Sequence, residues 1–331
     1  MSTSQIKALE DFIQLQNRNA MCHAIRAGVD VGIVKALSDG QKTVTELAEA
    51  LNLKPEPLAR LMNVLAKTEL VEQYDQYFAL STIARLIPEA FLDFGDAHWQ
   101  RLAEHVKTGV ALPDDPSQHA TQLDYLINKA TEEWTLTPAA IDAAQVLDIG
   151  KSRRGLRILE VECGSAVFGV TLAHRDPDSA LNLVDTAENL ERAKTTVQSV
   201  GLQRVQMIEV QDFDNLASTP QLNGQLFDLV VIAGLVHRRS QHEATDLLQQ
   251  LKQLVKPDRE LALIDIFPGQ EQGTTQRAVF ELELGLRTSR GQLHDPNDVK
   301  TMMESAGFMN IQYAHLPSVP FYWGLFLGTK S

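Results

Sequence analysis

The sequence predicts an α/β protein: a doubly wound, mostly parallel seven-stranded sheet, preceded by an all-helical domain with the element order of a winged helix. From about residue 153 on, five short apolar runs alternate with helical segments, which is the order of a parallel sheet covered by helices on both faces. Two further β-prone runs end the chain, and helix, turn, helix and hairpin patterns begin it. A length of 331 residues also predicts about two domains.

The N-terminal elements follow from apolar spacing and from helix-start signals. Thr43 followed by Glu46 predicts a capping box, and Pro55 and Pro57 suit the entry of the next helix. The expected elements are helices over 5–38, 43–51 and 57–70, a hairpin over 70–81, and bridging helices over 95–109, 120–134 and 138–150. We therefore expect a winged-helix-like domain over 1–95, a helical bridge over 96–150 and the sheet domain over 151–331.

The C-terminal half supplies the strands and helices of the sheet domain. Each strand run is apolar and short, and each intervening segment has helical spacing. The expected strands are 156–161, 181–185, 205–210, 227–234, 260–267, 310–316 and 321–329, and the expected helices are 166–175, 187–200, 242–255, 274–286 and 297–308. The last two strands should form an antiparallel edge.

Composition excludes several classes of function. The formal net charge is −13, whereas nucleic acid and anionic lipid need a basic surface. No apolar run approaches the roughly 20 residues of a membrane span, and no signal peptide is recognisable, so we expect a cytoplasmic protein. Two distant cysteines argue against disulfides and metal sites. The second helix offers Arg60, Asn63 and Lys67 to DNA, but the acidic balance favours a dimerisation module.

Ligands of such sheets bind at the carboxyl ends of the strands. The first strand runs into the sequence EVECGSAVFG, the second ends in Asp185, and the third is followed by Asp212 and Phe213. The fourth leads to His237 and the fifth carries Asp265 near its end. We therefore expect these side chains to gather at one edge of the sheet.

On these residues the chain resembles class I S-adenosylmethionine (SAM)-dependent O-methyltransferases with an N-terminal winged-helix dimerisation domain. The resemblance rests on the order of elements, on GIVKALSDGQKTVTELAEALNLKPEPLARLMNVLAKTELVEQYDQYFALS, and on HWQRLAEHVKTG, FDLVVIAGLVH, LLQQLKQLVKP and GQLHDPNDVKTMMESAGF. It implies a Rossmann-like SAM-binding domain, a homodimer formed through the N-terminal domain, and a small aromatic or polyketide-like methyl acceptor.

The resemblance also implies a cofactor loop after the first strand. Glu160 matches the family's acidic residue, and Gly164 keeps one of its glycines. Glu162 and Ala166 replace small or glycine positions, and Glu162 would face the amino or sulfonium group of the cofactor. Because the loop is altered, two interpretations remain open: the chain still binds SAM, or it has lost the ability to bind SAM.

Asp185, Asp212 and Phe213 are the remaining cofactor candidates. A carboxylate at the end of the second strand can accept both ribose hydroxyls, although Asp also caps helices. The resemblance implies that Asp212 accepts a hydrogen bond from the adenine amine and that Phe213 covers the face of the base. The alternative is that both residues simply belong to a surface turn.

The resemblance implies that His237 is the catalytic base and that Asp265 orients the base or the substrate. A histidine suits proton removal from a hydroxyl. The alternatives are a helix cap for His237 and a strand-end turn for Asp265. Arg238 and Arg239 stand where Asp-Trp is usual, so Arg238 is a candidate for an anionic substrate group. The helix residues expected to line the substrate cavity, or else the core, are Phe280, Leu284 and Thr288.

Two alternative functions remain open at this point. One is a divergent protein that keeps the methyltransferase fold, has lost methyl transfer and uses the pocket for other chemistry or ligand binding. The other is a winged-helix regulator with a ligand-sensing domain.

Overall fold

The computed structural model describes residues 3–82, 84, 99–111, 133–211, 213, 216–268, 274–318 and 322–331. The chain divides into two compact units, Met1–Gln100 and Arg101–Ser331. Each unit is built around its own apolar core.

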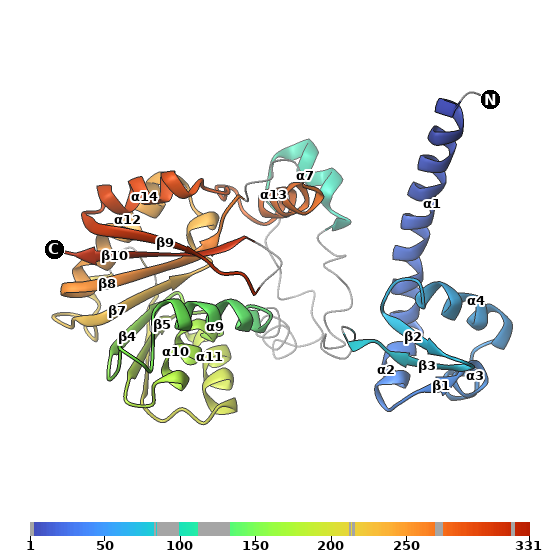
Figure 1. The fold of residues 1–331 in the computed structure, drawn as a ribbon, viewed down its shortest axis with the longest axis horizontal. Coiled ribbons are helices and arrows are strands. Elements are labelled where there is room, and N and C mark those ends of the chain that lie inside the picture. Colours follow the sequence, from blue (N-terminus) through green and yellow to red (C-terminus); the bar gives the residue numbers. More distant parts are fainter. Residues whose placement is uncertain are drawn as a thin grey trace. The chain divides into compact units, whose positions relative to one another are not determined.

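The N-terminal unit combines helices with a small sheet (Figure 1). Its elements are α1 (Thr3–Asp30), α2 (Ile33–Ser38), β1 (Lys42–Thr43), α3 (Val44–Leu51), α4 (Pro55–Leu65), β2 (Val71–Tyr74) and β3 (Tyr77–Leu80). The predicted capping box is present, because Thr43 accepts from the backbone N–H of Glu46 and Glu46 accepts from that of Thr43. The predicted hairpin is also present as β2 and β3.

Three details of this unit differ from the sequence-based expectation. The helix expected over 5–38 is two helices, separated by Gly32 at a φ of 82°. The helix expected over 57–70 runs from Pro55 to Leu65. The unit is not all-helical, because Lys42 and Thr43 pair with β3 and complete a three-stranded sheet in the order β1-β3-β2.

The C-terminal unit is a seven-stranded sheet in the order β6-β5-β4-β7-β8-β10-β9. Its strands are β4 (Arg157–Val161), β5 (Ala180–Asp185), β6 (Val205–Glu209), β7 (Phe227–Ala233), β8 (Val255–Ile266), β9 (Phe308–His315) and β10 (Trp323–Lys330). The first five strands are parallel and β10 pairs antiparallel with β8 and β9, as the sequence predicted. The predicted fold class is therefore confirmed.

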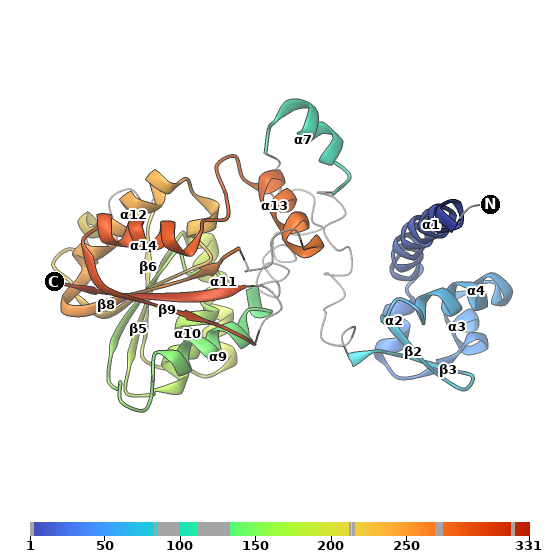
Figure 2. The same cartoon turned by 45° about the horizontal axis from the view of Figure 1, so that its top comes forward.

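Helices cover both faces of the sheet. Figures 1 and 2 show α9, α10 and α11 on one face and α12 and α14 on the other. The helical elements are α7 (Leu102–Thr108), α9 (Thr137–Val146), α10 (Val167–Arg175), α11 (Ala187–Ser199), η3 (Leu216–Ser218), η4 (Val236–Arg238), α12 (Gln241–Leu254), α13 (Thr275–Arg287) and α14 (Pro296–Ser305). Successive strand residues such as Ile158 and Leu159 belong to opposite apolar clusters, because side chains alternate across a sheet.

The strand order places a candidate binding region between β4 and β7. The chain passes from β4 to β5 and β6 on one side of the sheet, and then returns to β7 and β8 on the other. Parallel α/β sheets bind ligands at such a switch point, at the carboxyl ends of the strands. The loops after β4 and β7 are therefore the first place to look for a site.

Candidate active site

The loop after β4 has a glycine-type backbone at three alternating positions. Glu162, Gly164 and Ala166 have φ values of 49°, 54° and 59°, in the left-handed region that favours glycine. These are the positions at which the sequence resemblance expects glycines. The loop therefore keeps the backbone conformation of a glycine-rich loop although two of the three glycines are replaced.

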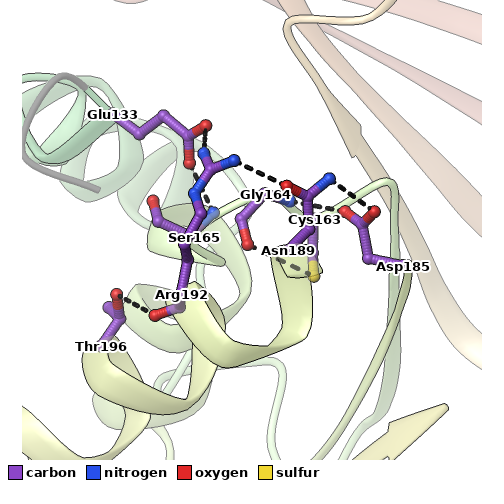
Figure 3. A network of polar contacts seen from close by, with 8 residues as sticks. All are labelled: Glu133, Cys163, Gly164, Ser165, Asp185, Asn189, Arg192 and Thr196. Atoms are coloured by element: carbon purple, nitrogen blue, oxygen red, sulfur yellow. Dashed lines mark hydrogen bonds and ion pairs between the residues drawn. The ribbon is translucent and has the colours of Figure 1, made fainter. Parts of the chain in front are cut away.

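Asp185 joins this loop to the end of β5. Its Oδ2 accepts the backbone N–H of Gly164 at 2.8 Å, and its Oδ1 accepts the side-chain N–H of Asn189 at 2.8 Å (Figure 3). Oδ1 also accepts the backbone N–H of Thr186 at 2.7 Å. Burial raises the pKa of Asp185, and these hydrogen bonds offset part of the rise. The N-cap of α11 is Thr186, so Asp185 is not the helix cap that the sequence left open.

A partly buried ion pair lies against the same loop. The Glu133 carboxylate accepts the backbone N–H of Ser165 and pairs with Arg192 of α11, whose other terminal nitrogen donates to Asn189 Oδ1 at 2.6 Å (Figure 3). A Cβ on Gly164 would come within 2.7 Å of Glu133 Oε2. Sequence reasoning did not identify Glu133, Asn189 or Arg192. The sequence feature that could have pointed to this pair is Arg192, a charged residue on the mostly apolar face of α11, beside Ala193.

Glu160 lies beneath the loop rather than on its open side. The side chain is fully buried, and Oε2 accepts the backbone N–H of Gly169 at 3.0 Å. Burial raises the pKa of Glu160 to about 8, and the charge of Asp185 adds to the rise while the Gly169 hydrogen bond opposes it. At neutral pH the side chain is therefore mainly a neutral acid that supports the loop.

Two of the departures from the family pattern contact one another. Glu162, at a glycine position, forms an ion pair with Arg239, which stands where the resemblance expects tryptophan. Arg239 also donates to the carbonyl oxygen of Leu235 at 3.1 Å. Burial raises the pKa of Glu162 and the charges of Arg239 and Arg238 oppose that rise. The pair links the loop after β4 to the loop after β7.

His237 and Asp265 form a hydrogen-bonded dyad at the carboxyl ends of β7 and β8. His237 Nδ1 lies 2.5 Å from Oδ1 of Asp265, whose side chain is 0% exposed. Burial raises the pKa of Asp265, but the charge and hydrogen bond of His237 and the N–H groups of Ile266 and His237 outweigh burial, and the pKa is lowered. Ser240 caps α12, so His237 does not serve as that cap. The Asp265 carboxylate bonds the His237 ring and the backbone N–H groups of Val236 and His237, which a residue that only forms a strand-end turn would not do.

A small, open pocket lies near the dyad, on the side of Phe280. Phe280 of α13 lines this cavity, and its ring centroid is 5.8 Å from that of His237. The remaining lining residues are Ile266, Phe267, Thr274, Gln276, Arg277, Leu293 and Tyr322. The lining is mainly aromatic and apolar, with Thr274, Gln276 and Arg277 as its polar members, which suits an organic molecule that carries a polar group.

The other predicted residues are not all brought to this cavity. Leu284 is buried in α13 and Thr288 bonds the carbonyl oxygen of Leu284 at 2.9 Å, so both make contacts within the helix. Arg238 is exposed. Phe213 packs on the core cluster under α12, and Asp212 lies outside the described residues.

The chemistry of the loop fits SAM. The backbone N–H groups of Gly164 and Ser165 donate to Asp185 and Glu133, whereas the hydroxyl of Ser165 is buried without a hydrogen-bond partner among the described residues. Asp185 presents a carboxylate at the end of β5, and the charge of Glu162 is compensated by Arg239. In the described part of the chain, no three metal-ligating side chains gather, and no helix has the length and apolar character of a membrane span.

Comparisons with known proteins agree with this geometry. The family model of the O-methyltransferase dimerisation domain matches residues 13–88, and one described as lysine methyltransferase matches residues 118–268. The mitomycin biosynthesis 6-O-methyltransferase of Streptomyces lavendulae is 26% identical over 273 residues, which cover 73% of each chain.

Solved structures share the fold over the whole length. A putative O-methyltransferase from Nostoc punctiforme has a TM-score of 0.76 at 19% identity, covering 96% of this chain and 98% of that one. Human N-acetylserotonin methyltransferase, solved in complex with SAM, has a TM-score of 0.74 at 16% identity and full coverage of both chains. The predicted resemblance to class I SAM-dependent O-methyltransferases is therefore confirmed, and the matches support a SAM-dependent methyltransferase.

Proposed function

We propose that this chain, a SAM-dependent methyltransferase by its family models and relatives, methylates a hydroxyl of a small aromatic or polyketide-like metabolite. The observation that carries the proposal is the His237–Asp265 dyad, which lies beside the aromatic cavity and one strand away from the loop after β4. The substrate class rests on the cavity lining and on the similarity to the mitomycin enzyme.

In this proposal SAM supplies an electrophilic methyl group. The loop 160–166 and Asp185 would hold the cofactor, and the Asp185 carboxylate would accept hydrogen bonds from its ribose hydroxyls. His237 Nδ1–H faces Asp265, which leaves Nε2 to accept the proton of the acceptor hydroxyl. The Asp265 carboxylate holds the ring and stabilises the imidazolium that forms.

The N-terminal unit supports a homodimer as part of the same proposal. The first half of α1 exposes five large apolar side chains, and the dimerisation-domain model matches residues 13–88. Those side chains are Ile6, Leu9, Phe12, Ile13 and Leu15. Contiguous apolar surface of this kind marks an interface, and we assign it to a second copy of the chain.

Two measurements test the function. Calorimetric titration with SAM and with S-adenosylhomocysteine tests the cofactor site, and transfer of a radiolabelled methyl group to a panel of phenols and hydroxyquinones tests the reaction. We expect binding of both ligands, transfer to at least one acceptor, and, in His237→Ala, a kcat lowered by about 10²–10⁴-fold with binding unchanged. Binding without transfer to any acceptor favours the reading in which the fold is kept and methyl transfer is lost. Absence of binding overturns the proposal.

A further inference from the structure

The loop that carries His237 is held by hydrogen bonds from outside itself. On one side, Asp265 Oδ2 accepts the backbone N–H groups of Val236 at 2.6 Å and of His237 at 3.2 Å. On the other side, the backbone N–H of Gln292 donates to the carbonyl oxygen of His237 at 2.8 Å. The short connection between α13 and α14 therefore runs directly along the loop of the proposed base.

His294 in this connection makes the most buried of these contacts. Its side chain is only 4% exposed, and Nε2 lies 3.1 Å from the carbonyl oxygen of Val236 and 2.9 Å from that of Arg239. Both neighbours are acceptors, so Nε2 must carry a hydrogen. Nδ1 lies 3.4 Å from the side-chain nitrogen of Gln292, which can donate to it. The contacts thus select one tautomer of His294, and its single N–H group bridges the two ends of the segment 236–239.

The approach of the two segments also requires glycine at position 291. A Cβ on Gly291 would lie 3.0 Å from the carbonyl oxygen of His237 and 2.2 Å from Oγ1 of Thr288. The same connection follows α13, whose Phe280 packs against the His237 ring. It therefore joins the helix that lines the cavity to the backbone that sets the direction of His237.

We propose that His294 is a positioning residue for His237: its Nε2–H, bound to the carbonyls of Val236 and Arg239, holds the loop so that the His237 ring keeps its bond to Asp265 and its direction toward the acceptor. This inference rests on the proposed function of His237. The structure thereby assigns the support of the loop that carries the base to a histidine of the α13–α14 connection. Displacement of a catalytic group by about 1 Å costs on the order of 10²-fold in rate.

Three substitutions separate a positioning role from general packing. His294→Leu introduces an apolar side chain of similar size and removes the donor. His294→Gln places an amide nitrogen near the position of Nε2, whereas His294→Asn places it near Nδ1, too short to reach the carbonyls. His242→Leu, on an exposed histidine of α12, is the matched control. We expect kcat to fall about 10–100-fold in the Leu and Asn variants, and to stay within about threefold in the Gln and control variants, with Kd for SAM and KM for the acceptor unchanged.

A double-mutant cycle tests whether His294 acts through His237. In the His237→Ala background, His294→Leu should lower kcat no further, because the residue it positions is gone. An additional loss of the same size, or a Gln variant no better than Asn, would overturn the proposal. If the Leu variant does not fold, the comparison of Gln with Asn remains.

Nitrogen-15 NMR of the imidazoles provides a readout that needs no substrate. The Nδ1–H signal of His237, which reports its bond to Asp265, should broaden or shift in His294→Leu and persist in His294→Gln. This result stands even if the chain transfers no methyl group, so failure of the proposed function and failure of this inference are distinguishable. An unchanged His237 signal in His294→Leu overturns the inference.

Discussion

Replacement of Asp265 by asparagine is the sharpest test of the proposed dyad. The carboxylate is fully buried, and each of its two oxygens accepts two hydrogen bonds. Oδ1 accepts from His237 Nδ1 at 2.5 Å and from the Ile266 N–H at 2.7 Å. Oδ2 accepts from the N–H groups of Val236 at 2.6 Å and His237 at 3.2 Å. In an asparagine, one of these two oxygens is replaced by an NH2 group. In either orientation of the amide, this NH2 group therefore faces two other hydrogen-bond donors.

The expected magnitude follows from those contacts. Each orientation removes two hydrogen bonds to a charged acceptor, at about 1.5–3 kcal/mol each, or about 3–6 kcal/mol together. With the amide nitrogen toward His237, the imidazole must accept at Nδ1 and carry its hydrogen on Nε2, so Nε2 can no longer remove a proton. We expect kcat to fall by about 10²–10⁴-fold, the usual contribution of a general base, and the unfolding free energy to fall as well.

The assay is methyl transfer at saturating SAM, with SAM binding measured by calorimetry on the same preparations. The chain offers a matched control in Asp246→Asn, because Asp246 lies 3.5 Å from His242 in an exposed pair on α12. That control should leave kcat and stability unchanged, since exposed pairs contribute little. A folded Asp265→Asn variant with the kcat of the parent protein would refute the reasoning and show that the dyad is structural.

Further predictions concern the cofactor, the loop and the assembly. Asp185→Ala should weaken SAM binding by about 1.5–3 kcal/mol in calorimetry, and unchanged affinity would remove Asp185 from the ribose. Glu160 has its pKa raised to about 8 when folded, so the native state retains a proton that the unfolded chain releases, and stability falls as pH rises from about 4.5 to 8. Glu160→Gln lacks this loss, so its unfolding free energy in urea should gain about 4 kcal/mol relative to the parent between pH 5 and 9; a difference that does not vary with pH would contradict the burial argument. Glu162→Gln and Arg239→Gln should show a coupling of about 0.5–3 kcal/mol in a double-mutant cycle of SAM affinity, whereas additive effects would show that the pair is incidental. Light scattering at micromolar concentration should give the mass of a dimer, and a monomer would count against the assignment of α1.

Most local features of this protein follow from short-range patterns in the sequence. Thr43 and Glu46 form the predicted capping box because both partners lie within one helical turn. The five parallel strands lie near their apolar runs, since burial on both faces requires such runs. His237 and Asp265 were predicted together because the carboxyl ends of adjacent parallel strands must meet at one edge of the sheet.

The pairings that complete the site were decided only by the tertiary structure. Glu162 and Arg239 lie 77 residues apart, and Glu133 and Arg192 lie 59 residues apart. In the sequence alone, Glu162 and Arg239 are two unrelated departures from the family pattern, and Arg192 is a charged residue in a helix. His294 likewise reaches the carbonyl oxygen of Val236 across 58 residues. No periodicity encodes such contacts, because they depend on how the loops after β4 and β7 and the α13–α14 connection meet above the sheet. The sequence by itself therefore determined the elements and the edge of the sheet that holds the site, and the packing of those loops decided which charged and polar side chains became partners.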